Sequence, residues 1–468
     1  MKFWKKSERK AGLSPVISNL FGLYGNFTYE LKRKLKDYLS TTGIKKIICT
    51  YDKIDKLVEF INPKEFKLLI DEYHNFLKQY SFRNKAIDGV LAHFKEFRSY
   101  CFISATPIPE VLKPTIFNGI PEHIADWNEV DDITIYPYHT DKPYMIAAQF
   151  IKVYQTKGFL NVNGKESKEA YFFINSVREI KDILKQTQLT EDDYRIICAD
   201  NDKNRMTLKG YTISSSTDTS KKFNFITSKS FEGVDFHSES GICFVVSNVQ
   251  NRHTLVSIDM DIPQIAGRIR TKTNPFRNKI VHIFNTKPTD HYTTYEEMEH
   301  TIQDEIKAAQ ERADLLNSSN LSESAIKQQV SEIHKIGNES YLSYQDGKFV
   351  VNDMIGKLQL YSFLITNVVY NSDKSLRDTY EQNKMIVTKG KWHIAPERFV
   401  KDLIKEPTFR DLHKRYCEIM KNPMTFNLET IEIEHKYPIL GRAYRKVGIQ
   451  ELKRLRTIKS IKLALGEI

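Results

Sequence analysis

An apolar, strand-like run that ends abruptly in acids constrains the fold of this chain more than any other feature. Residues 66–70 read Phe-Lys-Leu-Leu-Ile and are followed by Asp71, Glu72, Tyr73 and His74. A strand buried on both faces of a parallel sheet reads as such a run. Ligands of open α/β sheets bind just beyond the carboxyl ends of the strands. Both carboxylates are therefore expected where a ligand would lie.

Adjacent carboxylates in this position can divide the work of nucleotide hydrolysis. Asp71 can hold Mg²⁺ on the phosphates, and Glu72 can orient and deprotonate the attacking water. The stretch resembles the Walker B motif of DEAD/DEAH-type helicases of superfamily two, with Tyr73 at its third position. Taken alone it could equally be a strand followed by an acidic turn, because four-residue matches occur by chance. The neighbouring motifs favour the helicase interpretation.

Length and composition bound the possibilities. The 468 residues suffice for two or three domains, each with its own core. A hydrophobic content of 40% and an aromatic content of 12% indicate a folded chain. The formal net charge of +11 suits a nucleic-acid ligand, although many basic proteins bind none.

The cysteines and the hydropathy predict a soluble, cytoplasmic protein without a membrane partner. No two cysteines have the C-x-x-C spacing of a zinc site, and the first four lie in apolar runs, so they read as reduced core residues. The five are Cys49, Cys101, Cys198, Cys243 and Cys417. No run approaches the ~20 apolar residues of a spanning helix, and the first six residues lack the apolar stretch of a signal peptide.

Two further strand-like runs accompany the acids. The run 45–49 stops at Thr50, and the family resemblance implies that this threonine contacts the nucleic-acid backbone. The run 100–103 leads into Ser104-Ala105-Thr106-Pro107, which resembles motif III. In that motif the hydroxyls link the hydrolysis site to the nucleic-acid site. The resemblance thus implies a coupling role for Ser104, Thr106 and His74.

A second α/β domain is expected after a polar crossing segment at residues 131–145. Apolar strands at 171–176, 194–199 and 223–227 alternate with helical patterns, which indicates another parallel sheet. The resemblance implies that this is the second RecA-like lobe of the helicase family, with Asn175 of motif IV at the nucleic acid.

The third of these strands runs into residues 227–235, Thr-Ser-Lys-Ser-Phe-Glu-Gly-Val-Asp, which resemble motif V. Gly233 would let the backbone approach a ligand closely. Asp235 is placed to accept a hydrogen bond from the ribose or from the partner lobe, and Thr227 and Ser228 would meet nucleic-acid phosphate. The simpler alternative is a strand and turn with a chance Gly-x-Asp.

The most specific motif is Gln264-Ile265-Ala266-Gly267-Arg268-Ile269-Arg270, which resembles motif VI, Gln-x-x-Gly-Arg-x-x-Arg. In that motif the glutamine lies at the nucleotide and the arginines reach the γ-phosphate, where an arginine stabilises the transition-state charge by roughly 10³ to 10⁵ in rate. Here the second arginine follows two positions after the first instead of three. Arg268 is therefore the first choice for this role and Arg270 the second.

A phosphate-binding loop is missing ahead of the acids. The Walker A loop, G-x-x-x-x-G-K-[ST], cradles the phosphates with its backbone N–H groups, and nothing between Met1 and Asp71 matches it. Residues 158–167 imitate it with the wrong spacing and on the wrong side of Asp71. Only 44 residues precede Lys45, so we expect a first lobe truncated at its amino end, with Walker A lost or carried by a separate polypeptide.

We predict an α/β protein with two RecA-like parallel-sheet lobes, the first N-terminally incomplete, and a mainly helical C-terminal domain. The predicted domains are 1–140, 141–287 and 288–468. The resemblance implies an ATP-dependent helicase or translocase core that uses ATP and Mg²⁺ and binds DNA or RNA. Of the two nucleic acids we predict DNA as the ligand, and because Walker A is missing we predict that this chain alone is inactive. The alternative is a non-catalytic nucleic-acid-binding module. Usage rich in Lys, Ile and Asn suggests bacterial or phage replication or repair.

The last 28 residues carry eight basic residues from Arg442 to Lys462, against Glu451 and Glu467. Because Tyr444 lies among them, a nucleic-acid-binding arm is one interpretation. A solvated amphipathic helix is the other.

Overall fold

The computed structural model describes residues 20–125, 131–231, 233–288, 293–336, 340–345, 347–388, 409–420, 433–434 and 436–467. The chain forms two compact units, and each is built from three segments. The first unit comprises Met1–Ile133, Asn248–Arg268 and Thr286–Ile386. The second unit comprises Thr134–Ser247, Ile269–Asn285 and Val387–Ile468. The domain boundaries given above stay predictions.

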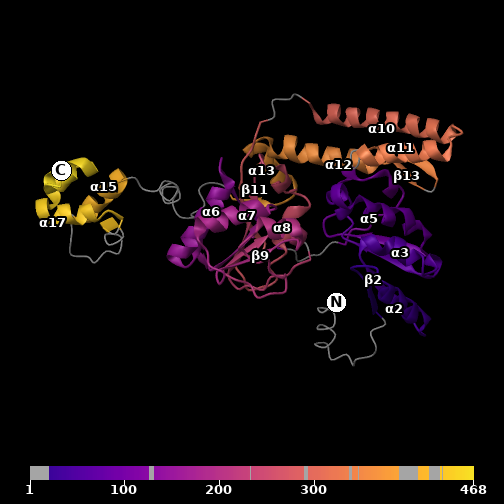
Figure 1. Cartoon of the computed structure of the whole chain (residues 1–468), viewed down its shortest axis with the longest axis horizontal. Helices are drawn as coiled ribbons and strands as arrows, with labels where there is room; N and C mark the ends of the chain where they lie inside the picture. Colours follow the sequence, from indigo (N-terminus) through magenta and orange to yellow (C-terminus); the bar gives the residue numbers. More distant parts are fainter. Residues whose placement is uncertain are drawn as a thin grey trace. The chain divides into compact units, whose positions relative to one another are not determined.

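The first unit contains two parallel strand pairs covered by helices. Strand β1 (Leu20–Leu23) pairs with β2 (Lys46–Cys49), and β3 (Lys67–Asp71) pairs with β4 (Ser99–Ile103). The helices are α2 (Tyr29–Ser40), α3 (Ile54–Val58), α4 (Asn75–Lys78) and α5 (Tyr80–His93), most of which are labelled in Figure 1. Buried side chains of these elements, such as Ile70 and Phe76, form a hydrophobic core.

Later segments of the chain belong to the same unit. They include α9 (Asp261–Ala266), α10 (Tyr295–Ser318), α11 (Glu323–Ile336), the hairpin β13 (Leu342–Gln345) and β14 (Lys348–Val351), α12 (Asp353–Phe363) and α13 (Asp373–Gln382). Met260, Ile302 and Met354 are buried in the core of the first unit. The carboxylate of Asp353 accepts a hydrogen bond from the backbone N–H of Thr115 at 2.7 Å. Met260, which directly precedes α9, therefore packs in the same core as the strand that carries the two acids.

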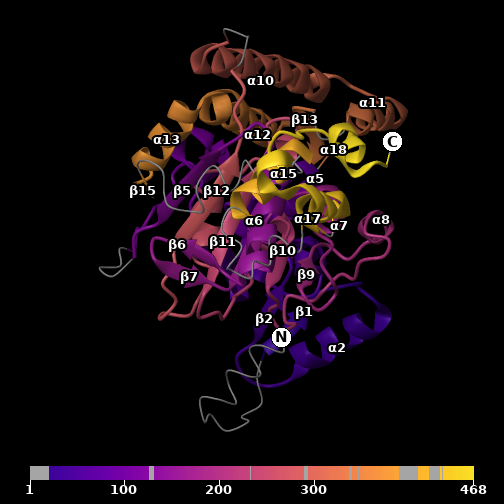
Figure 2. The ribbon, with the colours of Figure 1, turned by 90° about the vertical axis from the view of Figure 1, so that its left-hand side faces the viewer.

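The second unit is built on a seven-stranded sheet in the order β15-β5-β12-β11-β8-β10-β9. The strands are β5 (Thr134–His139), β8 (Glu169–Phe173), β9 (Tyr194–Ile197), β10 (Phe223–Ile226), β11 (Gly241–Ser247), β12 (Lys279–Phe284) and β15 (Ile386–Val387). The pairs among β5 and β8 to β12 are parallel. Helices α6 (Pro143–Lys157), α7 (Val177–Thr187) and α8 (Asp202–Thr207) connect them, as Figure 2 shows. All seven residues of β11 are buried, as expected for a parallel strand covered on both faces.

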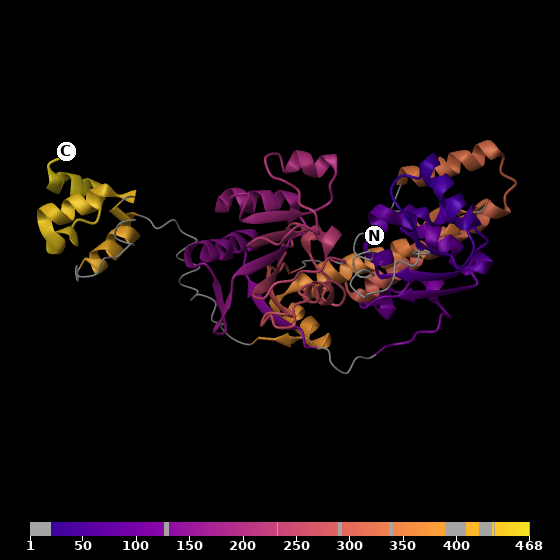
Figure 3. The ribbon, with the colours of Figure 1, turned by 90° about the horizontal axis from the view of Figure 1, so that it is seen from below.

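Near the carboxyl end, three helices form a small cluster with its own core, drawn in yellow in Figure 3. They are α15 (Phe409–Ile419), α17 (Pro438–Leu452) and α18 (Ile458–Leu465). The predicted class, α/β with parallel sheets and a helical C-terminal part, is confirmed. In the part of the chain that the structure describes, no helix is long and apolar enough to cross a membrane.

The strand that carries the acids is covered on one face only, contrary to the prediction that it is buried on both. Ile70 is 3% exposed, whereas Leu69 is 63% exposed. Its register partner Cys101 is exposed as well, so this cysteine is not a core residue, and Ile103 is 39% exposed. Side chains alternate between the faces of a strand, so Asp71 lies on the same side as Leu69. We call Leu69, Asp71, Cys101 and Ile103 the uncovered face.

Candidate functional site

The two acids lie at the carboxyl edge of the β3–β4 pair, where Asp71 is in register with Ile103. The Tyr51 hydroxyl donates hydrogen bonds to the backbone carbonyls of Asp71 and Glu72. Glu72 has a φ of +52°, a left-handed conformation that costs a non-glycine residue about 1 kcal/mol or more. The backbone therefore turns sharply at the second acid and is held there by a tyrosine that the sequence analysis did not single out.

A buried histidine holds the carboxylate of Glu72. The side chain of His74 is fully buried, and its Nδ1 lies 2.7 Å from Ser104 Oγ and 3.2 Å from Glu72 Oε2. The Ser104 hydroxyl is also within 3.4 Å of Glu72 Oε2. A polar group buried in this way keeps its place because its hydrogen bonds are satisfied. Two of the three residues predicted to couple the sites, His74 and Ser104, thus contact the predicted base directly.

The contacts continue to the arginine of the third motif. The backbone N–H of Thr106 donates to Ser104 Oγ at 3.0 Å, and Gln264 Nε2 donates to Thr106 Oγ1 at 3.2 Å. Arg268 donates from Nε to the Gln264 carbonyl at 2.7 Å and from Nη2 to Gln264 Oε1 at 3.2 Å. We call this series, from Glu72 through His74, Ser104, Thr106 and Gln264 to Arg268, the hydrogen-bond chain.

An ion pair that the sequence analysis missed anchors the helix of Gln264. Lys78 Nζ lies 2.5 Å from Asp261 Oδ1, and the two side chains are only 14% and 9% exposed. The other oxygen of Asp261 accepts from the backbone N–H of Ser257 at 2.8 Å. This pair joins α4, directly after His74, to α9. Its residues are 183 positions apart in the numbering, and no local pattern indicates that they meet.

The second arginine belongs to a different set of contacts. Arg270 Nε donates to Asp235 Oδ1 at 2.7 Å, and its backbone N–H donates to the Phe236 carbonyl at 2.9 Å. Both side chains of the ion pair are substantially exposed, so it stabilises the unit by about 1 kcal/mol at most. Gly233 is exposed, with a φ of +72° that favours glycine. Arg268 thus lies in the first unit, and Arg270, Asp235 and Gly233 in the second.

The residues predicted to contact nucleic acid are likewise divided between the two units. In the second unit the Ser228 backbone N–H donates to Asn175 Oδ1 at 3.2 Å. Thr227 is buried, and its hydroxyl lies 3.4 Å from the Ile197 carbonyl. These three residues therefore meet at the carboxyl ends of β8, β9 and β10, and Ser228 is the exposed one. In the first unit, Thr50 follows β2 and its N–H donates to the Leu23 carbonyl at 3.3 Å.

The residues around the acids suit the way in which proteins hold Mg²⁺. Asp71 is exposed at the end of its strand. Over the described ranges no group of three or more acidic, histidine or cysteine side chains could hold a metal by itself. Mg²⁺ is usually held by one or two carboxylates together with substrate phosphates and waters. A single carboxylate at this edge therefore fits Mg²⁺ that arrives with a nucleotide.

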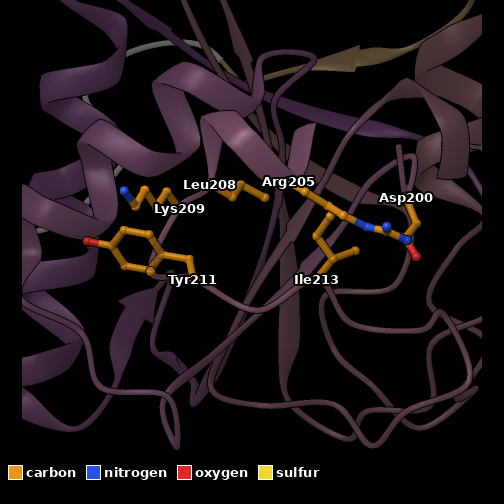
Figure 4. Close-up of a pocket in the computed structure, with 7 residues that line it drawn as sticks. Asp200, Arg205, Leu208, Lys209, Tyr211 and Ile213 are labelled. Carbon is orange, nitrogen blue, oxygen red and sulfur yellow. The ribbon is translucent and has the colours of Figure 1, made fainter. Parts of the chain in front are cut away.

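A pocket of about 260 Å³ lies elsewhere, in the second unit, and none of the predicted site residues lines it (Figure 4). Its lining residues are Asp200, Arg205, Leu208, Lys209, Gly210, Tyr211 and Ile213. Arg205 Nε lies 2.7 Å from Asp200 Oδ1, so two of its charged groups neutralise each other. The predicted site does not coincide with this pocket.

No protein-family model matches the sequence, and no curated protein is similar to it. Solved structures that are similar to the chain include three helicase-type proteins. The yeast DEAD-box splicing factor Prp28 is 16% identical over 66% of this chain and 63% of its own, with a TM-score of 0.21. The DEAD-box helicase Mss116 bound to ssRNA and UDP-BeF is 13% identical over 62% of this chain and 64% of its own, with a TM-score of 0.34.

The third structure, the Mycobacterium smegmatis helicase Lhr bound to ssDNA and AMP-PNP, is 12% identical over 95% of this chain and 63% of its own, with a TM-score of 0.37. This chain therefore matches less than two thirds of the length of each of the three. All three TM-scores lie below 0.5, so a functional assignment rests on the residues of this chain.

Proposed function

We propose that the chain is the core of an ATP-dependent nucleic-acid helicase or translocase. The observation that carries the proposal is the hydrogen-bond chain, which joins the carboxylate of Glu72 to the guanidinium of Arg268. Transfer of a phosphoryl group to water needs a residue that positions and deprotonates the water and a cation that stabilises the spreading negative charge. The hydrogen-bond chain has such a group at each end, the carboxylate of Glu72 and the guanidinium of Arg268.

In this proposal each of the predicted site residues that surround the two acids in the first unit has a role. Asp71 would hold Mg²⁺, which would neutralise phosphate charge. Glu72 orients the attacking water and accepts its proton, while His74 and Ser104 fix the carboxylate. Arg268 stabilises the γ-phosphate charge. The contacts of Thr106 and Gln264 couple Glu72 to Arg268, so that a displacement of one side chain displaces the other.

The proposed nucleic-acid contacts are Thr50 in the first unit and, separately, Asn175, Thr227 and Ser228 in the second. Among the last three, the exposed Ser228 is the first candidate for a phosphate contact, because the Thr227 hydroxyl faces a backbone carbonyl. We favour DNA over RNA as the ligand. A place in bacterial or phage replication or repair, in the cytoplasm, stays a prediction.

We further propose that a separate polypeptide segment supplies the missing phosphate cradle by packing on the uncovered face. Parallel sheets occur almost only with both faces covered by helices, and Leu69 and Ile103 leave one face bare. Asp71 lies on that side. A helix packed there, with its N-terminus at the carboxyl edge of β3, would direct backbone N–H groups towards phosphates beside the acids.

The alternative is a nucleic-acid-binding module without catalysis. The observation that favours it is that no Gly-x-x-x-x-Gly-Lys-Ser/Thr sequence occurs anywhere in the chain. In that case the hydrogen-bond chain would only stabilise the first unit. ATP dependence separates the two functions, since phosphate contacts by Lys and Arg do not need ATP.

A filter-binding titration of the full chain with single-stranded DNA and RNA, with and without Mg²⁺ and ATP, tests the proposal. We expect salt-dependent binding, in which log K falls with log salt by about 0.7 per phosphate contact. Ser228→Glu should weaken this binding several-fold through repulsion, whereas the same exchange at the exposed Ser324 of α11 should not. Absence of affinity for both nucleic acids at low salt would overturn the helicase and the binding-module proposals together.

A further inference from the structure

We infer that helices α15, α17 and α18 form a second nucleic-acid-binding site, which presents α18 to the major groove of double-stranded DNA. We call these three helices the C-terminal module. The inference goes beyond the proposed core function, because it needs neither ATP nor any residue of the hydrogen-bond chain.

The C-terminal module has its own hydrophobic core, which fixes the position of α18. Tyr416, Leu440, Leu452 and Ile461 are fully buried in it. His413 Nε2 lies 2.8 Å from the Leu452 carbonyl, and Lys446 Nζ donates to the Leu465 carbonyl at 2.7 Å. Because its inner side is held by these contacts, α18 can present its outer side without rearrangement.

The chain path resembles a helix-turn-helix arrangement. Helix α17 is interrupted at Gly448, whose φ of +72° is unfavourable for other residues. It resumes to Leu452, and a turn then leads to the cap residue Thr457, whose hydroxyl accepts from the Ser460 N–H at 3.1 Å. In helix-turn-helix proteins the second of two helices joined by a short turn enters the major groove.

Positive charge remains exposed around this second helix. Residues 409–420, 433–434 and 436–467 contain 12 Lys and Arg against 5 Asp and Glu. Arg442 and Arg445 pair with glutamates of the module and so hold it together. Arg456, Lys459 and Lys462 are exposed, and none of the described carboxylates lies within 4 Å of them.

The outer face of α18 combines charge with apolar surface. Lys459, Lys462 and Leu463 are spaced i, i+3 and i+4, so they share the face opposite the buried Ile461. Leu463 is 66% exposed. Lysines of such a helix can neutralise phosphates, and an apolar side chain beside them can contact a thymine methyl group in the groove.

The same geometry argues against other anionic partners. The major groove of A-form RNA is too narrow to be read by side chains, whereas that of B-form DNA admits a helix. A helix that lies on a membrane inserts a broad apolar face, but the apolar side of α18 is already buried in the module. Charge and shape therefore favour duplex DNA.

Fluorescence anisotropy with the full chain and a labelled duplex DNA of about 20 base pairs tests the inference. Lys459→Glu with Lys462→Glu should weaken duplex binding roughly tenfold or more at moderate salt and reduce the slope of log K against log salt by about 2, because two phosphate contacts are lost. The matched control is Lys307→Glu with Lys327→Glu on the exposed sides of α10 and α11, which changes the net charge equally. It should bind within about twofold of wild type if these contacts determine the slope.

Three further arms decide the identity of the ligand and guard against misfolding. Lys459→Gln with Lys462→Gln keeps good helix formers, so weaker duplex binding at an unchanged unfolding midpoint supports the inference. Equal affinities of the Lys459/Lys462 variants and the control for duplex DNA would overturn it. So would an equal loss for duplex RNA or for vesicles of anionic phospholipid, which would show attraction to any polyanion.

Discussion

At the scale of single residues, the most informative feature is the backbone of Glu72. A left-handed glutamate persists only where its surroundings outweigh the conformational cost. The hydrogen bonds of Tyr51 to the backbone and of Ser104 to the carboxylate, with His74 Nδ1 3.2 Å from Glu72 Oε2, supply that stabilisation. The result is a carboxylate with fixed orientation at a sheet edge, which suits the positioning of a water molecule.

We predict different effects of substitutions at the two ends of the hydrogen-bond chain once a phosphate-binding segment completes the site. Glu72→Gln should leave nucleotide binding intact and lower kcat by roughly 10² to 10⁴, because the amide cannot accept a proton. Arg268→Ala should lower kcat more than nucleotide affinity, because its charge matters most in the transition state. Steady-state kinetics measure both.

Arg270→Ala serves as the comparison, since its guanidinium is paired with Asp235 in the second unit. We expect a smaller loss of kcat than for Arg268→Ala. An unchanged rate for Glu72→Gln or Arg268→Ala would remove that residue from the mechanism.

A second residue-scale prediction concerns pH. His282 of β12 is fully buried, and this burial lowers the pKa of its imidazole to about 3. The unfolded chain, with a histidine pKa of about 6.5, binds more protons below that pH. The buried, neutral His282 therefore makes its full contribution to the free energy of unfolding above about pH 6.5. This contribution is lost as the pH falls towards 3, by at most about 1.4 kcal/mol per pH unit.

Urea unfolding at pH 7, 6, 5 and 4 measures this dependence. His282→Asn should unfold with a shallower pH dependence than wild type, because the group that must take up a proton on unfolding is gone. The exposed His123 provides the matched His→Asn control. Equal slopes for His282→Asn and wild type would show that His282 is solvated in the folded state.

At the scale of elements, the β3–β4 pair shows that a strand whose apolar sequence predicts burial on both faces can be covered on one face only. Leu69 and Ile70 are both apolar residues of one run, so the sequence pattern predicts the same burial for both. The structure separates them, since one is 63% exposed and the other 3%. This asymmetry supports the proposal that a further segment completes the first unit.

We predict that alanine substitutions at these adjacent residues differ sharply in cost. Ile70→Ala should lower the free energy of unfolding by about 2 to 5 kcal/mol, because it leaves a cavity in the core. Leu69→Ala should change it by less than about 0.5 kcal/mol, as expected for an exposed site. Denaturant unfolding of both variants measures the difference, and a similar loss at Leu69 would mean that this face is covered in the chain on its own.

At the scale of the whole molecule, one short motif is divided between the two compact units. The first unit ends a segment at Arg268, and the second begins one at Ile269. Arg268 is bonded to Gln264 and Arg270 to Asp235, each within its own unit. The altered spacing of the two arginines therefore coincides with a passage of the chain between units.

We predict that the chain on its own does not hydrolyse ATP at a useful rate. Without a cradle of backbone N–H groups and a lysine, the phosphates are not positioned, and positioning with charge stabilisation is almost all that this reaction receives from a protein. Phosphate release with Mg²⁺, ATP and single-stranded DNA or RNA should fall far below the usual range of about 1 to 10³ per second. Turnover within that range, abolished by Glu72→Gln, would show that residues 1–44 provide a substitute cradle.

The sequence by itself determined the fold class and the order of the candidate motifs, because apolar runs and short polar signatures are local properties of the chain. It could also place Ser104 and Thr106 after one strand and Ser228 after another, whereas it placed Asn175 inside a strand that the structure ends at Phe173. The sequence could not predict which of these side chains contact one another, since contacts between distant segments depend on how the segments pack.

Only the tertiary structure decided that Lys78 pairs with Asp261 and that Gln264 reaches Thr106. It alone turned the Thr227 hydroxyl towards the Ile197 carbonyl and left Leu69 bare. The physical reason is the same in each case. Burial and pairing are set by the neighbours that packing brings from elsewhere in the chain, and a strand or helix does not encode them in its own residues.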